Sequence, residues 1–513
     1  MAAVVTDQFR LSNASNFVDS VTSATNSYYV YLGFPSPNSP VGDFGRFSDW
    51  NTNIPSPTDN LQYAGFYKKN ILFGKKVNSA NIRRVIRKVN WTVNNRYDMY
   101  RHDYSVSNPT PNSNSSRLYD CDYYVMNSDF RVYVCIDNGS SGTNPKGNNS
   151  QDEPTFTSLA PSAAGTSGDG YVWKYLFSVS PSDIIKFDST EYIVVPNKWD
   201  SSTDPQISDV REAGNSDVQL NQIKKVYIDD GGKGYSAGTV DILGDGTGGR
   251  VSITVDSTGA ITGTTVIDGG KGYTFGIVDL GSVQPQGSIP NPAKLIPIIP
   301  PSKGHGFDVY SELGTDKVLI YARFDSSTKD FPVDTQFAQV GIIKNPQQAT
   351  SDSIFTQSQF SALSAIKLTD DFTGTPVVGA EMTQTRTDGN VAKGYVASYD
   401  SETKVLKYFQ DRSLYYNGSD QTDYDSVTTD STIYAFESSA QTISPFSGSI
   451  NTTFGDSTVT IGSKVINLGV TFDGGLASPE INKKTGDLIY IDNRPIVNRD
   501  IRQKEDVKII LEF

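Results

Sequence analysis

Few residues of this 513-residue chain are of the types that carry out acid–base, nucleophilic or metal chemistry. There are two histidines, His102 and His305, and two cysteines, Cys121 and Cys135. So few ligands exclude zinc fingers, histidine-rich metal sites and a disulfide scaffold. His305 stands between two glycines, which favours a turn because no nucleophile lies nearby at a recognisable spacing. The cysteines are equidistant from Ser128 and could face each other across a hairpin. We expect packed thiols, with a disulfide or a metal as the alternatives.

Acidic residues that lie close together could serve glycoside hydrolysis or bind calcium. The candidate groups are Asp229/Asp230, Asp370/Asp371 and Asp420/Asp423/Asp425. None has the spacing of an EF-hand loop, and acidic turns are common in a chain of net charge −13. We therefore interpret these carboxylates as parts of solvated loops.

Two glycine-rich motifs could suggest a nucleotide site. Residues 244–249 match the dinucleotide pattern GxGxxG, but the segment that follows, RVSITVD, has the pattern of a strand. Without a helix N-terminus the motif has no means of holding a pyrophosphate. The GGKGY blocks beginning at Gly231 and Gly269 lack the GK[ST] of a P-loop. Their glycines are expected to supply positive φ in turns. The sequence thus predicts no catalytic, cofactor-binding or metal-binding site, and we expect a protein that is not an enzyme.

The overall charge limits the classes of partner. The chain has 44 Lys and Arg against 57 Asp and Glu, and its pI is near 4.8. This acidic balance argues against nucleic acid as a general partner and against adsorption to anionic membranes. The N-terminus has no charged region followed by an apolar one, and no apolar run approaches the roughly 18 residues of a membrane span. We expect a protein that is made in the cytoplasm.

One segment departs from the acidic average, because residues 68–90 contain basic side chains and no acidic one. The apolar spacing of Ile82, Val85, Ile86 and Val89 predicts one face of a helix. Four basic residues would then point outward: Arg83, Arg84, Arg87 and Lys88. We predict that they form a surface for docking an acidic neighbouring protein, because an ordinary solvated face usually mixes charges. A solvated helix face is the alternative.

Most of the chain has the pattern of short strands and turns. It contains 44 glycines and 25 prolines, and 11% of its residues are aromatic. Hairpins are predicted with turns at 127–129, 257–259 and 401–403, and the two GGKGY blocks mark a duplicated β module. The fold class is therefore mainly β, an α+β chain with few short helices and several domains. The predicted organisation is 1–214 frame, 215–285 glycine-rich duplicated β module, 286–361 proline connector and return to the frame, 362–464 small β domain, and 465–513 C-terminal strands completing the frame.

Several blocks, in order, resemble the baseplate wedge protein encoded by gene eight of T-even-like contractile-tailed bacteriophages. The specific ones are GDGYVW at 168–173, EYIVVP at 191–196 and IYIDNRP at 489–495. Weaker blocks keep the same order at 3–10, 55–60, 85–91, 131–137, 319–325, 337–346 and 507–513. The resemblance leaves out the glycine repeat and the region 362–464, which look like insertions. It implies a discontinuous, β-sandwich-like frame that carries two inserted β modules.

The resemblance also implies a function. A protein similar to this family is a non-enzymatic subunit without cofactors, which holds neighbouring wedge proteins together during assembly and during the rearrangement that triggers contraction. It would form a homodimer beside subunits resembling the products of genes six, seven and ten. Its location would be the tail baseplate of the virion, after assembly in the host cytoplasm. The alternative is a carbohydrate- or receptor-binding tail module, with the inserted repeat as its binding surface.

Overall fold

The protein divides into two compact units. The computed structural model describes residues 6–34, 50–52, 54, 56, 57, 61–284, 291–325, 335–371, 377, 378, 380–410, 434–439, 441–445, 448–499 and 503–513. Unit 1 consists of Met1–Asn16, Arg83–Leu319 and Ile510–Phe513, and unit 2 of Phe17–Ile82 and Ile320–Ile509. The chain passes from one unit to the other within α1 (Asp7–Thr22), β3 (Ile82–Arg87), β14 (Lys317–Asp325) and β27 (Lys504–Glu512).

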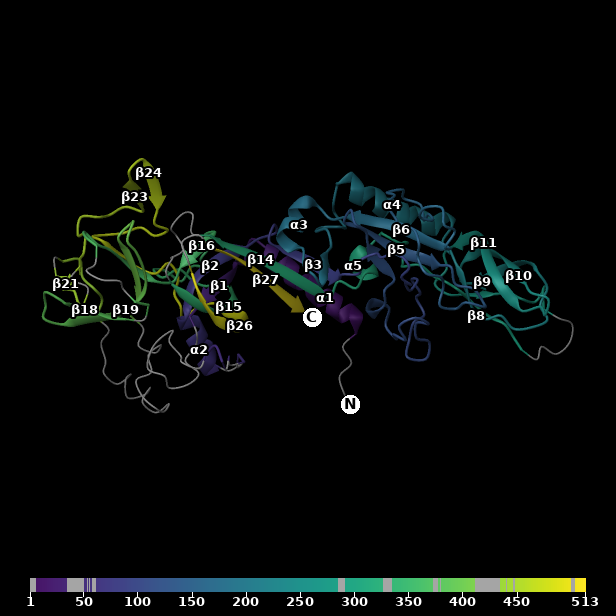
Figure 1. The fold of residues 1–513 in the computed structure, drawn as a ribbon, viewed down its shortest axis with the longest axis horizontal. Helices are drawn as coiled ribbons and strands as arrows, with labels where there is room; N and C mark the ends of the chain where they lie inside the picture. Colours follow the sequence, from purple (N-terminus) through teal and green to yellow (C-terminus); the bar gives the residue numbers. More distant parts are fainter. Residues whose placement is uncertain are drawn as a thin grey trace. The chain divides into compact units, whose positions relative to one another are not determined.

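The elements confirm a mainly β, multidomain protein (Figure 1). The helices of unit 1 are η1 (Leu118–Asp120, a 3-10 turn), α3 (Pro181–Phe187), α4 (Pro205–Leu220) and α5 (Val309–Glu312). Its strands are β4 (Tyr124–Met126), β5 (Arg131–Asn138), β6 (Tyr171–Ser178), β7 (Tyr192–Val194), β8 (Val226–Asp230), β9 (Gly238–Gly244), β10 (Thr247–Val255), β11 (Ile261–Lys271), β12 (Gly276–Val278) and β13 (Lys294–Pro297). The sandwich-like packing of the frame stays a prediction.

The main core of unit 1 forms around the antiparallel sheet β4-β5-β6. Its side chains are mostly aromatic and β-branched, which suits a pleated sheet covered on both faces. Tyr171 and Trp173 stack with their ring centroids 5.3 Å apart, and the ring of Tyr97 meets Trp173 edge-on at 5.8 Å. Helix α4 packs against β6 and contributes Ile207 and Val210 to the same core.

The predicted hairpin at 127–129 is confirmed by β4 and β5, but the register separates the two cysteines. The loop spans residues 127–130, and Phe130 in it has a φ of 57°. Cys135 consequently lies opposite Tyr123, whose carbonyl accepts its backbone N–H. The expectation that Cys121 and Cys135 face each other is therefore wrong. Both are free, buried thiols of the unit 1 core.

The two glycine-rich blocks share the same local backbone conformation. Its sheet has the order β11-β10-β9-β12, and the predicted turn at 257–259 joins β10 to β11. In both GGKGY blocks the second and third glycines have positive φ, from 60° to 83°: Gly232, Gly234, Gly270 and Gly272. Each block also buries its tyrosine, as Tyr235 and Tyr273.

The core of this module extends past its predicted limits. Strand β13 pairs with β8, and Leu295 and Ile299 join the module's apolar cluster although they come from the predicted proline connector.

Helix α4 runs through the predicted boundary at 214/215, and its sequence carries helix signals that the prediction did not use. Asp204 caps its first turn, Pro205 occupies the first helical position, and the buried residues recur at helical spacing. The domain boundaries stay a prediction. Pro285 and Pro290 of the connector lie outside the described residues.

Unit 2 contains two five-stranded sheets. The first has the order β16-β2-β1-β15-β26, formed by β16 (Gln359–Ser361), β2 (Ile71–Val77), β1 (Tyr28–Gly33), β15 (Gln336–Lys344) and β26 (Asp487–Asn498). The second has the order β18-β19-β20-β17-β25, formed by β18 (Glu381–Thr385), β19 (Val391–Asp400), β20 (Val405–Phe409), β17 (Ser364–Lys367) and β25 (Leu476–Ala477). Helix α2 (Leu61–Lys69) and two short hairpins, β21 (Thr442–Ile443) with β22 (Gly448–Ser449) and β23 (Thr458–Ile461) with β24 (Lys464–Asn467), complete the unit.

The turn predicted at 401–403 is confirmed by the pairing of β19 with β20.

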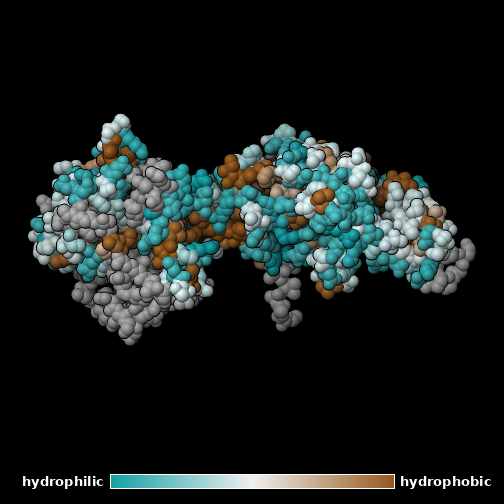
Figure 2. Space-filling view, viewed as in Figure 1, coloured by the Kyte–Doolittle hydropathy of each residue, from teal (hydrophilic) through white to brown (hydrophobic). Residues whose placement is uncertain are grey.

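The visible face of the molecule is mostly hydrophilic, with smaller hydrophobic patches (Figure 2). Within the described part of the chain, no helix is both long and apolar enough to span a bilayer.

Candidate functional site

The basic segment that the sequence singled out is a strand and not a helix. Residues Ile82–Arg87 form β3, which pairs antiparallel with β7 in the register Val85 to Val194. The apolar spacing fits a helix, but it equally fits a strand that is covered on both faces, and the backbone hydrogen bonds to β7 decide the outcome. Successive side chains of a strand point to opposite faces. The four basic residues therefore do not share one outward face.

Arg83 and Arg84 are held by contacts inside unit 1. The Arg83 guanidinium donates to both carboxylate oxygens of Asp183, with Nη2–Oδ1 at 2.8 Å and Nε–Oδ2 at 3.1 Å. It also lies 5.1 Å from the centre of the Phe187 ring. Arg84 donates to Ser15 Oγ at 2.8 Å and stacks 3.9 Å above the ring of Tyr310. Both arginines thus tie β3 to other elements of the unit.

Arg87 and Lys88 are also paired. Arg87 Nη2 lies 2.5 Å from Asp122 Oδ1, and Lys88 Nζ lies 2.8 Å from Asp188 Oδ1. The side chain of Arg87 is 45% exposed, but those of Lys88 and Arg83 are only 12% and 14% exposed. The expectation that all four basic side chains point freely into solvent is therefore wrong. Whether this segment docks a partner stays a prediction.

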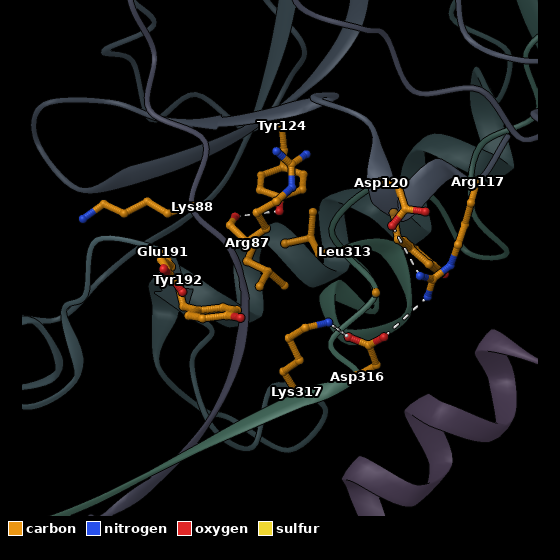
Figure 3. Close-up of a pocket in the computed structure, with 13 residues that line it drawn as sticks. Arg87, Lys88, Arg117, Asp120, Tyr124, Glu191, Tyr192, Leu313, Asp316 and Lys317 are labelled. Atoms are coloured by element: carbon orange, nitrogen blue, oxygen red, sulfur yellow. Dashed lines mark hydrogen bonds and ion pairs between the residues drawn. The ribbon is translucent and has the colours of Figure 1, made fainter. Parts of the chain in front are cut away.

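A pocket of about 400 Å³ opens beside Arg87 (Figure 3), and we call it the tyrosine pocket. Its wall is made of residues from β3, β4, η1, β7 and the loop after α5: Ile86, Arg87, Lys88, Arg117, Tyr119, Asp120, Tyr124, Glu191, Tyr192, Leu313, Gly314, Asp316 and Lys317. Gly314 has a φ of +65°, and a Cβ there would lie 2.4 Å from the Tyr119 ring. Glycine at this position therefore allows the ring to form part of the wall.

Ion pairs link the charged residues of the tyrosine pocket. Arg117 Nη2 lies 2.7 Å from Asp7 Oδ1 and 3.4 Å from Asp316 Oδ2. Lys317 Nζ lies 2.9 Å from Asp316 Oδ1 and 3.2 Å from Glu512 Oε1. In Figure 3 the Lys317 amine points to Asp316, whereas the Lys88 side chain extends away from both. These pairs bring segments near both chain ends to the tyrosine pocket.

The carboxylate partners raise the pKa of three basic residues at the pocket. Burial lowers the pKa of Arg87, Arg117 and Lys317, yet in each case the hydrogen bonds and charges of nearby carboxylates outweigh it. The pKa of all three cations is therefore raised above the ordinary value. Burial, followed by the charge of Asp7, raises the pKa of Tyr119 to about 12. Each of the basic side chains that line the pocket thus has a carboxylate partner within the chain.

Both histidines make hydrogen bonds within the fold, and the GxGxxG motif leads into a strand. His305 is buried, and its Nδ1 lies 2.6 Å from Glu312 Oε1 in a turn whose two glycines have φ of +86° and +87°. His102 Nδ1 accepts the backbone N–H of Ile299 at 3.2 Å. As predicted, strand β10 and not a helix follows the GxGxxG motif at 244–249.

The acidic groups have local partners. Asp229 pairs with Lys294 at 2.6 Å, Asp230 accepts the backbone N–H of Gly232, and Asp371 accepts the Tyr399 hydroxyl. The group Asp420/Asp423/Asp425 lies outside the described residues. Within the ranges that the structure covers, no three His, Cys, Asp or Glu residues are grouped so that they could hold a metal ion.

Sequence reasoning found Arg87 and Lys88 but missed most of the tyrosine pocket. Its other residues come from segments that are far apart in the chain, and no local motif connects them. The block EYIVVP, one of the blocks that carry the family resemblance, contains Glu191 and Tyr192 and could have pointed to this site.

The fold and the site are those of a multidomain, mainly β protein whose candidate site is a charged pocket in unit 1. A family model described as "Bacteriophage T4, Gp8" matches residues 133–227. The chain is also 28% identical over 231 residues to "Baseplate wedge protein gp8" of Enterobacteria phage T4, an alignment that covers 40% of this chain. The alignment spans 63% of that relative, less than two thirds of its length. Both findings confirm the resemblance to the gene-eight baseplate wedge protein.

Proposed function

We propose that this chain is a structural subunit of the baseplate wedge of a contractile bacteriophage tail. The observation that carries the proposal is the family match at 133–227, because this segment builds the core of unit 1. Strands β5, β6 and β7 and helix α4 fall within or overlap it, as do the buried Trp173 and Trp199. The likeness therefore concerns the scaffold of the unit and not a short surface motif.

The finer parts of the proposal follow from the resemblance. The subunit acts without catalysis, forms a homodimer, and contacts wedge subunits resembling the products of genes six, seven and ten. It assembles in the host cytoplasm and then remains in the baseplate. The many intramolecular ion pairs of unit 1 support a mechanical role, since they hold the elements of a rigid block in one arrangement.

A reconstruction of the intact virion tests the proposal. We expect the chain to fit density in the baseplate as a dimer, and light scattering of the purified protein to give twice 55.9 kDa. Density for the chain only at the tip of a receptor-binding fibre would refute the proposal. Specific retention of the full chain on a glycan array would favour the alternative of a carbohydrate-binding tail module.

A further inference from the structure

The hairpin formed by β23 and β24 is a separate two-stranded sheet of unit 2. Figure 1 shows it projecting from the other strands of the unit. One face attaches it, because Ile466 is buried and Val459 packs against the cluster that contains Leu468 and Phe472. The opposite face is exposed, and Val465 on it is 64% exposed. A sheet of two strands is only marginally stable in water, so this hairpin would gain stability from a further strand.

Both outer edges of the hairpin carry backbone groups that are open to a partner. The register of β23 with β24 has no bulge. Leu468 donates its backbone N–H to Ser457 O at 2.8 Å, and in an antiparallel ladder such bonded pairs alternate with pairs that are not bonded to each other. The backbone groups of four exposed residues therefore point away from the hairpin: Thr458 and Thr460 on β23, and Val465 and Asn467 on β24. Among the described residues, none makes a hydrogen bond to these groups.

These backbone groups specify the chemistry of the partner. N–H and C=O groups that alternate along an edge are matched by another extended polypeptide strand, which is how strand addition works. Native edge strands are commonly protected against such pairing by a charged side chain, a proline or a bulge. Strand β24 contains Lys464, whereas β23 (Thr458–Ile461) has none of these features. The unprotected edge of the hairpin is therefore that of β23.

The charges around the hairpin favour a second copy of this chain as the source of that strand. The chain has a net charge of −13, and like charges oppose the approach of two copies. Residues 457–472 contain no acidic residue and a single basic one, so two hairpins can meet without this repulsion. When β23 pairs antiparallel with itself, Val459 lies opposite its symmetry mate and Thr458 lies opposite Thr460 of the other copy. This register brings no like charges together.

We propose that β23 pairs antiparallel with β23 of a second copy, so that the two hairpins form one continuous sheet across a two-fold axis. This inference names the contact surface of the homodimer, and it therefore rests on that part of the proposed function. The backbone groups of Thr458 exchange hydrogen bonds with those of Thr460 in the other copy, and the symmetry repeats the exchange. The outer strands of the combined sheet are then the two β24 strands with Lys464, so that assembly ends at a dimer.

Proline substitutions in the full-length chain test this edge. Thr460→Pro removes an N–H that points outward and leaves the hydrogen bonds of the hairpin in place. Light scattering over a dilution series should show the dimer dissociation constant raised by about tenfold or more, because the two-fold symmetry removes the same hydrogen bond twice. The matched control is Val465→Pro, which makes the same backbone change at the residue opposite Thr460 but on the outer edge of β24. The control should dimerise like the wild type.

A cysteine cross-link tests the register in chains that keep their edge intact. Val459→Cys places two thiols opposite each other, at a Cα separation of about 4.5–5.5 Å that permits a disulfide. Cys121 and Cys135 are buried, so oxidation should join two chains only through residue 459. The control is Val465→Cys, because Val465 is more exposed than Val459 and chance collisions would cross-link it more readily. We expect only Val459→Cys to give a covalent dimer on a non-reducing gel.

The outcomes separate this inference from the proposed function. A wild-type dimer that Thr460→Pro leaves intact and that Val459→Cys does not cross-link would overturn the β23 contact and leave the wedge role standing. A covalent dimer through Val465→Cys alone would show pairing by the other edge and would also overturn the inference. A monomeric wild type would overturn the inference together with the homodimer, while the virion reconstruction would still decide whether the chain belongs to the baseplate.

Discussion

The pair Arg83–Asp183 should be a strong contributor to the stability of unit 1. The two side chains are 14% and 12% exposed, and two hydrogen bonds join them in a bidentate arrangement. The change Asp183→Asn keeps the shape of the side chain but removes the carboxylate charge that faces Arg83 in a mostly buried place. Breaking a buried pair from one side costs about 3–5 kcal/mol, and because this pair keeps some solvent contact we expect about 3 kcal/mol.

A matched control lies at the other end of the same short helix. Asp188 pairs with Lys88 of the same segment, but its side chain is 45% exposed. The Lys88 side chain is only 12% exposed, but water reaches the carboxylate of this pair, so Asp188→Asn should cost about 1 kcal/mol, near the upper end of the values for exposed pairs. Both variants make the same chemical change, one inside α3 (Pro181–Phe187) and one at its C-cap, so a difference between them reports the burial of the carboxylate.

Urea unfolding followed by tryptophan fluorescence measures both variants. Trp91, Trp173 and Trp199 belong to unit 1 and Trp50 to unit 2, so the signal reports mainly unit 1. With an m-value of about 3 kcal/mol/M, the midpoint should fall by about 1 M in Asp183→Asn and by about 0.3 M or less in Asp188→Asn. Equal shifts in the two variants would refute the reasoning that burial sets the strength of these pairs.

Three further predictions concern other buried or strained positions. Burial raises the pKa of the Asp98 carboxyl. Deprotonation of this carboxyl as the pH rises therefore lowers the free energy of unfolding. Asp98→Asn should therefore raise the melting temperature at pH 7, and scanning fluorimetry should find no gain below the ordinary carboxyl pKa of 3.8. Burial raises the pKa of Cys121 to about 12 and also raises the pKa of Cys135, so both thiols should resist a disulfide reagent in native protein and react in urea. Gly270→Ala should lower the melting temperature more than Gly272→Ala. Both glycines have positive φ, but only at Gly270 would a Cβ lie 2.5 Å from a backbone oxygen.

The sequence determined the features that depend on neighbouring residues. The hairpin turns predicted at 127–129, 257–259 and 401–403 follow from turn residues between β-branched and aromatic runs, and β strands form on both sides of each. The positive φ of the GGKGY glycines was likewise predictable, because only glycine adopts it without strain. The ordered blocks that resemble a gene-eight wedge protein were also readable without a structure, since they are linear motifs.

The tertiary structure alone decided the state of residues 82–88 and the chemistry of the site beside them. The apolar pattern of this segment fits a helix and a strand equally well, and the choice is made by β7, which lies about 100 residues later in the chain. The charge of the site depends in the same way on distant partners. Asp7, Asp183, Asp316 and Glu512 approach the basic side chains of unit 1 only after folding. Basic residues that have no acidic neighbour in the sequence are therefore paired with carboxylates in the fold, because electrostatic interactions act through space and not along the chain.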